Sequence, residues 1–305
     1  MTFRTRFAPS PTGPLHLGHA YSAMFAHDMA RTNGGEFLVR IEDIDRSRCR
    51  SEWEELIYDD LCWLGVLWDD QVIRQSARGD TYAGALDQLA SRGLLYACGC
   101  NRRDVMEAAS APHGGPLYGP DGVVYPGTCR ERNLAFSEGQ TVLRLDMSKA
   151  LDELSEASLT FEELGMGPEG QSGSIQLRKD DLRERVGDVV LARRDMGTSY
   201  HLSVVVDDAA QAISHIVRGQ DLFEATCIHV VLALLLGFQV PKYHHHGLIR
   251  DEHGKRLAKR DDARAIRKYR EDGATVDDIR GLVGLDARRK NPSAARSFSP
   301  RSSGP

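Results

Sequence analysis

Residues 4–19, with the sequence RTRFAPSPTGPLHLGH, decide how this chain folds. Phe3–Ala8 has the character of a short strand, a turn containing proline and glycine breaks it, and apolar spacing then predicts a helix over Leu15–Thr32. A turn that leads from a strand into a helix exposes backbone N–H groups at the start of the helix, which is a natural phosphate site. His16 and His19 are three residues apart, so both are expected on one face of the first helical turns.

The segments that follow have the order of a doubly wound α/β fold. Glu36–Ile41 is predicted to be a second, apolar strand, and Asp43–Leu64 carries the apolar spacing of a helix. Strand–helix–strand order with apolar strands is typical of a parallel sheet covered by helices on both faces. After an interruption, this order is expected to resume in Asp188–Ala192, Tyr200–Asp207, Ile213–Val217 and the helix Leu222–Phe238.

Composition limits the classes of function. The 305 residues are 41% hydrophobic and 27% charged, which is ordinary for a soluble globular protein. No apolar run approaches the roughly 20 residues that a membrane span needs, and the N-terminus lacks the apolar core of a signal peptide. We therefore expect a cytoplasmic protein with no membrane partner. The six cysteines are too few for a disulfide scaffold in a chain of this length.

With the Pro-Ser-Pro-Thr-Gly that precedes it, His16-Leu17-Gly18-His19 resembles the HIGH motif of class I aminoacyl-tRNA synthetases. In that family the two histidines bind ATP phosphates and stabilise charge while the amino-acid carboxylate attacks the α-phosphorus. The resemblance implies catalytic and ATP-binding roles for His16 and His19. Gly18 would leave room for a flat ring or a ribose beside the backbone. The resemblance also implies ATP with Mg²⁺ as a substrate and tRNA as a partner.

A second motif lies about 240 residues later, just after a predicted hairpin at His244–Glu252. Residues 254–261, GKRLAKRD, resemble the KMSKS loop of the same family, within a basic stretch that can follow phosphates or form a solvated charged face. Arg256 and Ala258 differ from the usual lysine and serine of this loop. Lys259 keeps the place of the second lysine, which makes it the expected catalytic contact to the phosphates of ATP.

The opening residues 6–13, RFAPSPTG, match the glutamyl type of these synthetases. By that match Arg6 pairs with the side-chain carboxylate of glutamate, for which a guanidinium is well suited. Glu42 would hold the α-ammonium group from the end of a parallel strand, where open α/β sheets bind ligands. The other matched glutamate contacts are Ser10, Tyr200 and Arg218.

Three cysteines indicate a metal site. Cys98, Cys100 and Cys129 could surround a structural, tetrahedral Zn²⁺ that holds together a segment with little apolar core. The resemblance suggests Tyr125 as the fourth ligand, with His113 or water as alternatives. Three free thiols without metal are the remaining interpretation.

The resemblance predicts a Rossmann-like class I synthetase catalytic domain with an inserted zinc-binding subdomain and a short helical C-terminal region. Residues 1–97 and 188–250 would form its two halves, and residues 98–187 the insertion. Residues 251–290 would carry the KMSKS-type loop and helices that contact an RNA stem. The Ser-, Arg- and Pro-rich residues 291–305 are expected to be a disordered tail.

The expected activity is a two-step ligation by a monomer. Glutamate and ATP would form glutamyl-adenylate, and an RNA hydroxyl would then take the glutamyl group. Only 45 residues follow Arg260, whereas synthetases that charge tRNA(Glu) continue into a large anticodon-binding domain. The short form resembles the branch that attaches glutamate to queuosine in the anticodon loop of tRNA(Asp). The alternatives are a truncated enzyme that charges a tRNA 3′ end, a ligase that joins glutamate to a small amine, and a non-enzymatic RNA-binding regulator.

Overall fold

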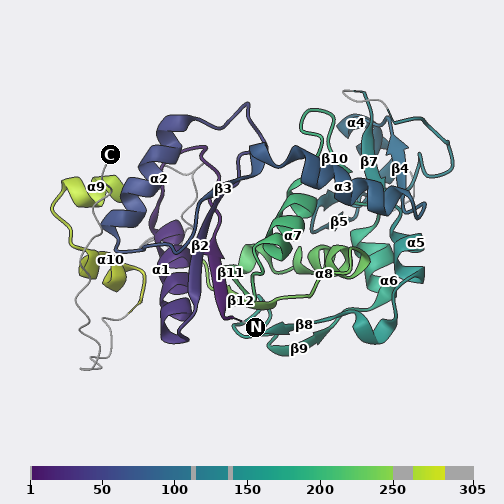
Figure 1. Ribbon diagram of the computed structural model, residues 1–305. Helices are drawn as coiled ribbons and strands as arrows, with labels where there is room; N and C mark the ends of the chain where they lie inside the picture. Colours follow the sequence, from purple (N-terminus) through teal and green to yellow (C-terminus); the bar gives the residue numbers. More distant parts are fainter. Residues whose placement is uncertain (1, 111–114, 137–139, 250–263, 286–305) are drawn as a thin grey trace.

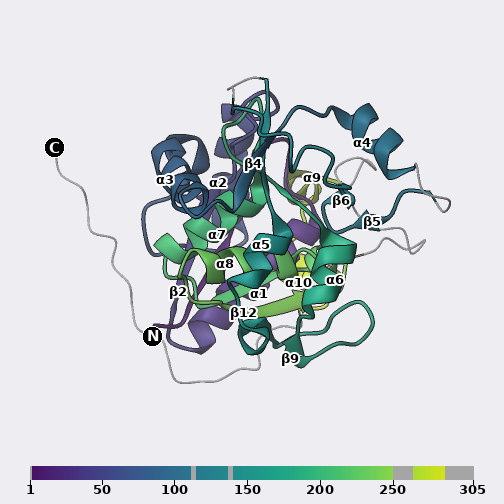
Figure 2. The same cartoon turned by 90° about the vertical axis from the view of Figure 1, so that its right-hand side faces the viewer.

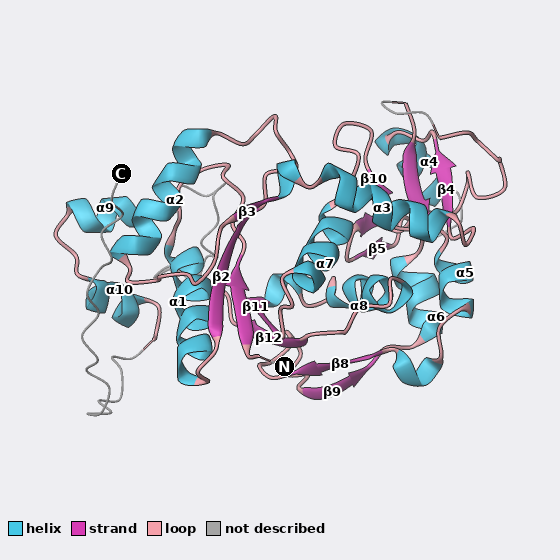
Figure 3. Ribbon diagram, viewed as in Figure 1, coloured by secondary structure: helices cyan, strands magenta, loops and turns pink. Residues whose placement is uncertain are grey.

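Two sheets form the centre of the computed structural model, which describes residues 2–110, 115–136, 140–249 and 264–285 (Figures 1 and 3). The first sheet contains β1 (Arg4–Phe7), β2 (Glu36–Ile41) and β3 (Ile73–Arg74). The second sheet contains β11 (His215–Gly219), β12 (Lys242–His246), β8 (Thr160–Glu163) and β9 (Gly173–Gln176). Lys259, His113 and the tail 291–305, which carry predictions, lie outside the described residues.

The central strands are parallel, as predicted. β1 pairs with β2, β2 with β3, β11 with β12 and β12 with β8, all in parallel, and β9 alone among these strands runs antiparallel to its neighbour. β1 and β11 lie side by side, because the backbone N–H of Ser214 donates to the carbonyl of Arg4 at 3.0 Å. The carboxyl ends of β1, β2 and β11 therefore meet in one region.

Helices cover both faces of these strands (Figure 1). On one side lie α1 (Leu17–Thr32), α2 (Ser51–Trp63), α9 (Ile266–Glu271) and α10 (Val276–Leu282). On the other side lie α3 (Gly79–Ala90), α7 (Tyr200–Ala210) and α8 (Thr226–Leu235). The first group shares a buried cluster with β1 and β2 that includes Met24, Phe37 and Leu61, and the second shares a cluster that includes Leu89, Leu202 and Ile228.

A third, antiparallel sheet belongs to the middle of the chain. It is formed by β4 (Leu95–Cys98), β7 (Val142–Leu145) and β10 (Val190–Ala192). Around it lie α4 (Arg102–Ala109), β5 (Tyr118–Gly119), β6 (Gly122–Val123), α5 (Met147–Asp152), α6 (Lys179–Asp181) and the π-helical turn Leu182–Val186. α4, β5 and β6 are at the edge of the molecule in Figure 2. The described residues also include three short 3₁₀ turns, at Gln75–Ala77, Glu156–Ser158 and Gln220–Leu222.

Three expectations were wrong in detail. Asp188–Ala192 was expected to resume the parallel order, but β10 pairs antiparallel with β7. The helix expected from Asp43 begins only at Ser51. The first residues of the hairpin expected at His244–Glu252 belong to the parallel strand β12, and residues 250–252 lie outside the described residues. An apolar strand can pair in a parallel or an antiparallel direction. Which strand it pairs with therefore depends on segments that are distant in the sequence. The boundaries 1–97, 98–187, 188–250 and 251–290, as folding units, stay a prediction.

Candidate active site

A cleft of about 440 Å³ opens at the carboxyl ends of β1, β2 and β11. It brings together predicted residues from both halves of the sequence: Arg6, His16, Gly18, His19, Glu42, Tyr200 and Arg218. Of the other predicted contacts, Ser10 is described but does not line this cleft, and Lys259 lies outside the described residues. The residues predicted to bind ATP and most of those predicted to bind glutamate therefore lie together at the carboxyl ends of the strands, where open α/β sheets bind ligands.

The two histidines shape the beginning of α1. His16 is the residue before the helix, and its Nδ1 accepts a hydrogen bond from the N–H of Gly18 at 3.1 Å. His19 Nδ1 accepts one from the N–H of His16 at 3.2 Å, so the two side chains cap the helix reciprocally. The ring centroids are 3.8 Å apart. A Cβ on residue 18 would lie 3.1 Å from the His16 ring, so glycine allows this close packing.

A buried carboxylate on α7 holds two arginines: Arg6, which lines the cleft, and Arg40, which is fully buried. Asp208 accepts hydrogen bonds from Arg6 Nε at 3.0 Å and Arg6 Nη2 at 3.3 Å. It also accepts one from Arg40 Nη1 at 2.6 Å. Burial acts to raise the pKa of Asp208, but Arg40 and Arg6 outweigh it and lower this pKa below its usual range. Asp208 therefore stays ionised and fixes the guanidinium of Arg6.

Glu42 follows β2 and lines the cleft together with Arg6. Its carboxylate accepts a hydrogen bond from Arg40 Nη2 at 3.2 Å. Burial raises the pKa of Glu42 above its ordinary value, although Arg40 and Arg6 oppose that shift. A cationic ligand group beside Glu42 would favour the ionised carboxylate, so the position suits an ammonium group.

Arg218 is held differently, by three neutral acceptors. Its Nε donates to His245 Nε2 at 3.0 Å, its Nη1 to His229 Nδ1 at 3.0 Å and its Nη2 to Thr226 Oγ1 at 2.7 Å. Burial, followed by Arg218 itself, holds the pKa of His229 well below its ordinary value, so this ring is a neutral acceptor. Within the described residues, Arg218 has no carboxylate partner, which leaves its charge available to a ligand carboxylate.

These hydrogen bonds determine the tautomers of the surrounding histidines. Because His245 Nε2 accepts from Arg218, its proton lies on Nδ1 and is donated to Glu163 Oε2 at 2.5 Å. Burial acts to raise the pKa of Glu163, but the hydrogen bond from His245 outweighs it and lowers this pKa. In the same way His229 donates from Nε2 to His201 Nδ1, which lies 3.1 Å away. A carboxylate on β8 thus orients Arg218 through one imidazole.

Sequence reasoning missed Asp208, Glu163, His229 and His245. All four are buried polar residues within otherwise ordinary helices or strands. One signal was available for His245, which stands in the run His244-His245-His246. Since side chains alternate across a strand, a β12 strand places His245 on the opposite face from its two neighbours. His246 contacts Tyr21, with ring centroids 4.6 Å apart, and His245 contacts Arg218.

The three predicted cysteines form one cluster. The sulfur atoms of Cys98, Cys100 and Cys129 lie within 4.8 Å of one another. The hydroxyl of Tyr125 is 3.4 Å from the sulfur of Cys98 and 3.5 Å from that of Cys100, and it also accepts a hydrogen bond from the N–H of Cys129. Burial acts to raise the pKa of Cys129, but hydrogen bonds led by that from Tyr125 lower it to about 7. The cluster is compatible with a zinc ion.

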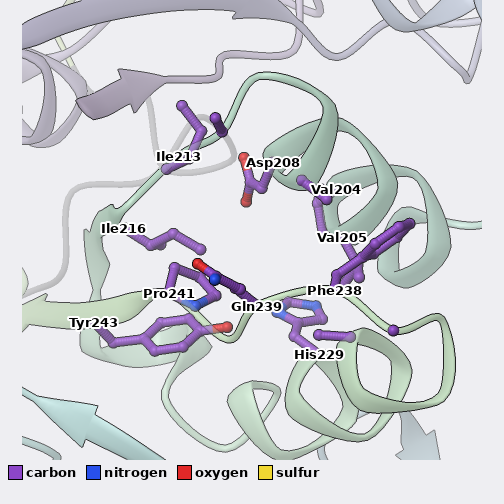
Figure 4. A pocket seen from close by; sticks show the side chains of 14 residues that line it. Val204, Val205, Asp208, Ile213, Ile216, His229, Phe238, Gln239, Pro241 and Tyr243 are labelled. Carbon is purple, nitrogen blue, oxygen red and sulfur yellow. The ribbon is translucent and has the colours of Figure 1, made fainter. Parts of the chain in front are cut away.

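A separate apolar cavity of about 280 Å³ lies between α7, α8 and the start of β11 (Figure 4). Its walls are mostly aliphatic and aromatic side chains such as Val205, Ile216 and Phe238. Asp208 and His229 also reach this cavity (Figure 4). Asp208, which holds Arg6, and His229, which holds Arg218, therefore border apolar surroundings, which strengthens their hydrogen bonds.

The fold and the cleft define a class I aminoacyl-tRNA synthetase. Residues 2–283 match the family described as tRNA synthetases class I (E and Q), catalytic domain. The chain belongs to this family, and the resemblance seen in its motifs is confirmed. Membership implies a ligase that uses ATP, with glutamate and tRNA as partners. No helix in the described parts of the chain is both long and apolar enough to cross a membrane.

Known relatives match this chain over most of their own length. The chain is 59% identical over 284 residues to a Glutamyl-Q tRNA(Asp) synthetase of Rhodobacter capsulatus, with 92% of this chain and 99% of the relative covered. It is 40% identical over 262 residues to the protein of the same name from Geobacter sulfurreducens, covering 86% and 76%. A crystal structure of glutamate-tRNA synthetase from Elizabethkingia anophelis superposes with a TM-score of 0.74 at 25% identity. That match covers 93% of this chain and 61% of the synthetase.

Asp208→Asn is expected to lower the free energy of unfolding by about 3 kcal/mol at pH 7, because it leaves two buried arginines without their shared carboxylate. The folded-state pKa of Asp208 is lowered, so its stabilisation is present above the unfolded-state pKa of about 3.9 and is lost as the pH falls through the lower folded-state pKa. Urea unfolding between pH 7 and pH 3 measures this difference. Equal stability of the two proteins at pH 7 would contradict the role of Asp208.

Proposed function

We propose that this chain activates glutamate with ATP and transfers it to queuosine in the anticodon loop of tRNA(Asp). The observation that carries the first step is the cleft, in which two arginines, a carboxylate and the His16–His19 turn converge. The acceptor is supported by the name of the Rhodobacter capsulatus relative, a Glutamyl-Q tRNA(Asp) synthetase, 99% of whose length is covered at 59% identity.

The cleft suits both ends of a glutamate molecule. Arg6 and Arg218 would bind its side-chain carboxylate, and Glu42 its α-ammonium group. The hydroxyl of Tyr200, whose pKa burial raises, would stay protonated and donate a hydrogen bond. Ser10 is retained as a proposed contact, although it is not part of the lining of the cleft. Two guanidinium groups select a dicarboxylic amino acid over a neutral one of similar size.

The phosphates of ATP would lie at the start of α1. His16, Gly18 and His19 line that end of the cleft. Ile266 donates its backbone N–H to the carbonyl of Leu15 at 2.8 Å, so the chain that follows the KMSKS-type loop returns to the same turn. Lys259 is seven residues before Ile266, a separation that spans at most about 25 Å. This return of the chain supports Lys259 as a phosphate contact.

The reaction needs no covalent enzyme intermediate. The α-carboxylate of glutamate attacks the α-phosphorus of ATP, a new C–O–P bond forms, and pyrophosphate leaves. A queuosine hydroxyl then attacks the carbonyl carbon, an ester forms, and the bond to AMP breaks. The hydroxyl proton passes to the leaving AMP phosphate or to water. His16 and His19 would stabilise charge at the α-phosphate, and bound Mg²⁺ would neutralise the charge of the other phosphates.

Zinc is proposed as a structural ion. Cys98, Cys100 and Cys129 would supply three thiolates, and Tyr125 is the proposed fourth ligand because its hydroxyl lies among their sulfur atoms. His113 lies outside the described residues, so it stays an alternative. The ion would bind together β4 and the loop at Cys129, whose local cluster contains few other buried apolar side chains.

Purified protein is expected to contain about one zinc ion per chain, because three thiolates and one further ligand complete a tetrahedral site. Cys129→Ser should lose most of this zinc and lower the thermal unfolding midpoint, as measured by elemental analysis and calorimetry. Cys62→Ser is the control, since Cys62 is exposed and lies outside the cluster. A wild-type protein that binds no zinc after reconstitution would favour three free thiols.

Glu163→Gln is expected to raise the KM for glutamate about tenfold, because a neutral amide no longer holds the His245 proton on Nδ1 and Arg218 loses its aligned acceptor. The KM for ATP should be unchanged, since the His16 turn is not part of this hydrogen-bonded chain. Pyrophosphate-exchange kinetics measure both constants. Glu162→Gln is the matched control, because Glu162 stands on the same strand and pairs with Lys242 at the surface. An unchanged KM for glutamate in Glu163→Gln would show that Arg218 is held without this carboxylate.

The proposed function is tested by transfer of labelled glutamate, with ATP, to three RNAs. These are queuosine-containing tRNA(Asp), queuosine-free tRNA(Asp) and tRNA(Glu), with pyrophosphate exchange measured in parallel. We expect exchange, and label on the queuosine-containing RNA alone.

Each other result selects a different function. Label on the 3′ end of tRNA(Glu) would identify an enzyme that charges tRNA. Exchange without labelled RNA would favour a small amine as acceptor, and the absence of exchange would favour an RNA-binding regulator. The monomeric state and the cytoplasmic location stay predictions.

A further inference from the structure

A second cleft, of about 340 Å³, has no lining residue in common with the first. Three segments line it: the loop after β2, the residues around the turn Gln75–Ala77, and the loop between β10 and α7. Ile44 in its wall is two residues after Glu42, and Thr198 is two residues before Tyr200. A molecule in this second cleft would therefore lie next to the glutamyl group held in the first.

The second cleft contains a buried hydroxyl that lacks a partner. Thr198 is only 3% exposed, and its Oγ1 has no hydrogen-bond partner among the described residues. Burying an unpaired hydroxyl is unfavourable, and native structures rarely retain one without a reason. A polar atom of a ligand in the cleft would supply the missing hydrogen bond.

The same cleft carries positive charge that no carboxylate balances in the described residues. Arg46 Nη2 donates to the carbonyl of Ser76 at 2.8 Å. Arg194 Nη2 donates to the carbonyls of Gly99 and Cys100 at 2.8 and 2.9 Å, and its buried Nε has no partner within the described parts of the chain. Neither arginine forms an ion pair in the parts of the chain that the structure describes.

The two acidic residues of the lining do not cancel this charge, since each has its own arginine. Asp45 pairs with Arg48 at 2.5 Å, and Asp195 pairs with Arg193 at 3.3 Å. Backbone carbonyl groups orient both arginines, and no carboxylate of the described residues neutralises them. Such a pair of arginines is a suitable site for phosphate.

We propose that the second cleft binds the acceptor nucleotide of the RNA, with Thr198 bonding to a polar atom of its ring system and Arg46 and Arg194 contacting its phosphates. This inference rests on the proposed function. Proteins that read single-stranded loops hold unstacked bases in such polar pockets, and the volume is in the usual range for ligand sites. The reacting hydroxyl then lies at the edge of the second cleft that faces Glu42 and Tyr200.

Thr198→Val tests this placement with little change of shape. We expect the KM for the acceptor RNA to rise about tenfold, because one buried hydrogen bond to the ligand is lost. Pyrophosphate exchange and the KM values for ATP and glutamate should be unchanged. The thermal unfolding midpoint should stay the same or rise, since an unpaired buried hydroxyl is removed. A purely structural role for Thr198 would lower that midpoint and leave the KM for RNA unchanged.

Arg194→Gln tests the phosphate contact. We expect weaker binding of a queuosine-containing anticodon stem-loop, and a plot of log affinity against log salt whose slope is reduced by about 0.7 to 0.9. Arg185→Gln is the control, because it removes the same charge at an exposed residue that pairs with Asp181, and neither residue lines the cleft. Zinc content of both variants verifies that the loop at Cys100 is intact.

The outcomes separate this placement from the proposed function. The placement alone is overturned if the wild-type protein transfers glutamate to an RNA and the variants have an unchanged KM and affinity for that RNA. Wild-type protein that performs exchange but labels no RNA overturns both. Label on the 3′ end of tRNA(Glu) overturns queuosine as the acceptor, and a raised KM for that RNA in Thr198→Val would then still support the second cleft as the nucleotide site.

Discussion

The position of the cleft depends on a carboxylate that two buried arginines share. Arg6 on β1 and Arg40 on β2 cannot be buried as charges without a partner, and Asp208 on α7 provides it. The hydrogen bond between Arg6 and Asp208 joins residues that are 202 positions apart in the sequence. It therefore ties the first half of the fold to the second at the point where the strand ends meet.

The two arginines proposed to bind glutamate are fixed in chemically different ways. Arg6 is partly neutralised by Asp208, whereas Arg218 is surrounded by the neutral acceptors His229, His245 and Thr226. Aligning a guanidinium through neutral groups fixes its direction and leaves its charge to the ligand. Glu163 contributes only through His245, whose proton it holds on Nδ1. One arginine thus mainly organises the fold, and the other mainly carries the attraction for an anion.

The cysteine cluster and the second cleft are also connected. Arg194 lines the second cleft and donates to the carbonyls of Gly99 and Cys100, so the loop that precedes Tyr200 rests on the loop that carries two of the three cysteines. A metal-stabilised loop would therefore support one wall of a polar cleft beside the glutamate residues. This arrangement gives the insertion a positional role that its small apolar content alone would not suggest.

The sequence by itself determined the turn at His16, the parallel core strands and the cysteine cluster, and it predicted glutamate contacts most of which line one cleft, because short-range spacing and motif residues carry that information. Only the tertiary structure decided that β10 leaves the parallel order and that Asp208, Glu163, His229 and His245 hold the arginines. Glu163 and His245 are 82 residues apart, and no local pattern indicates which buried polar side chains will meet across such a separation. Pairing of this kind depends on how the apolar faces of helices and strands pack. That packing determines which polar side chains are buried together and must form hydrogen bonds with one another.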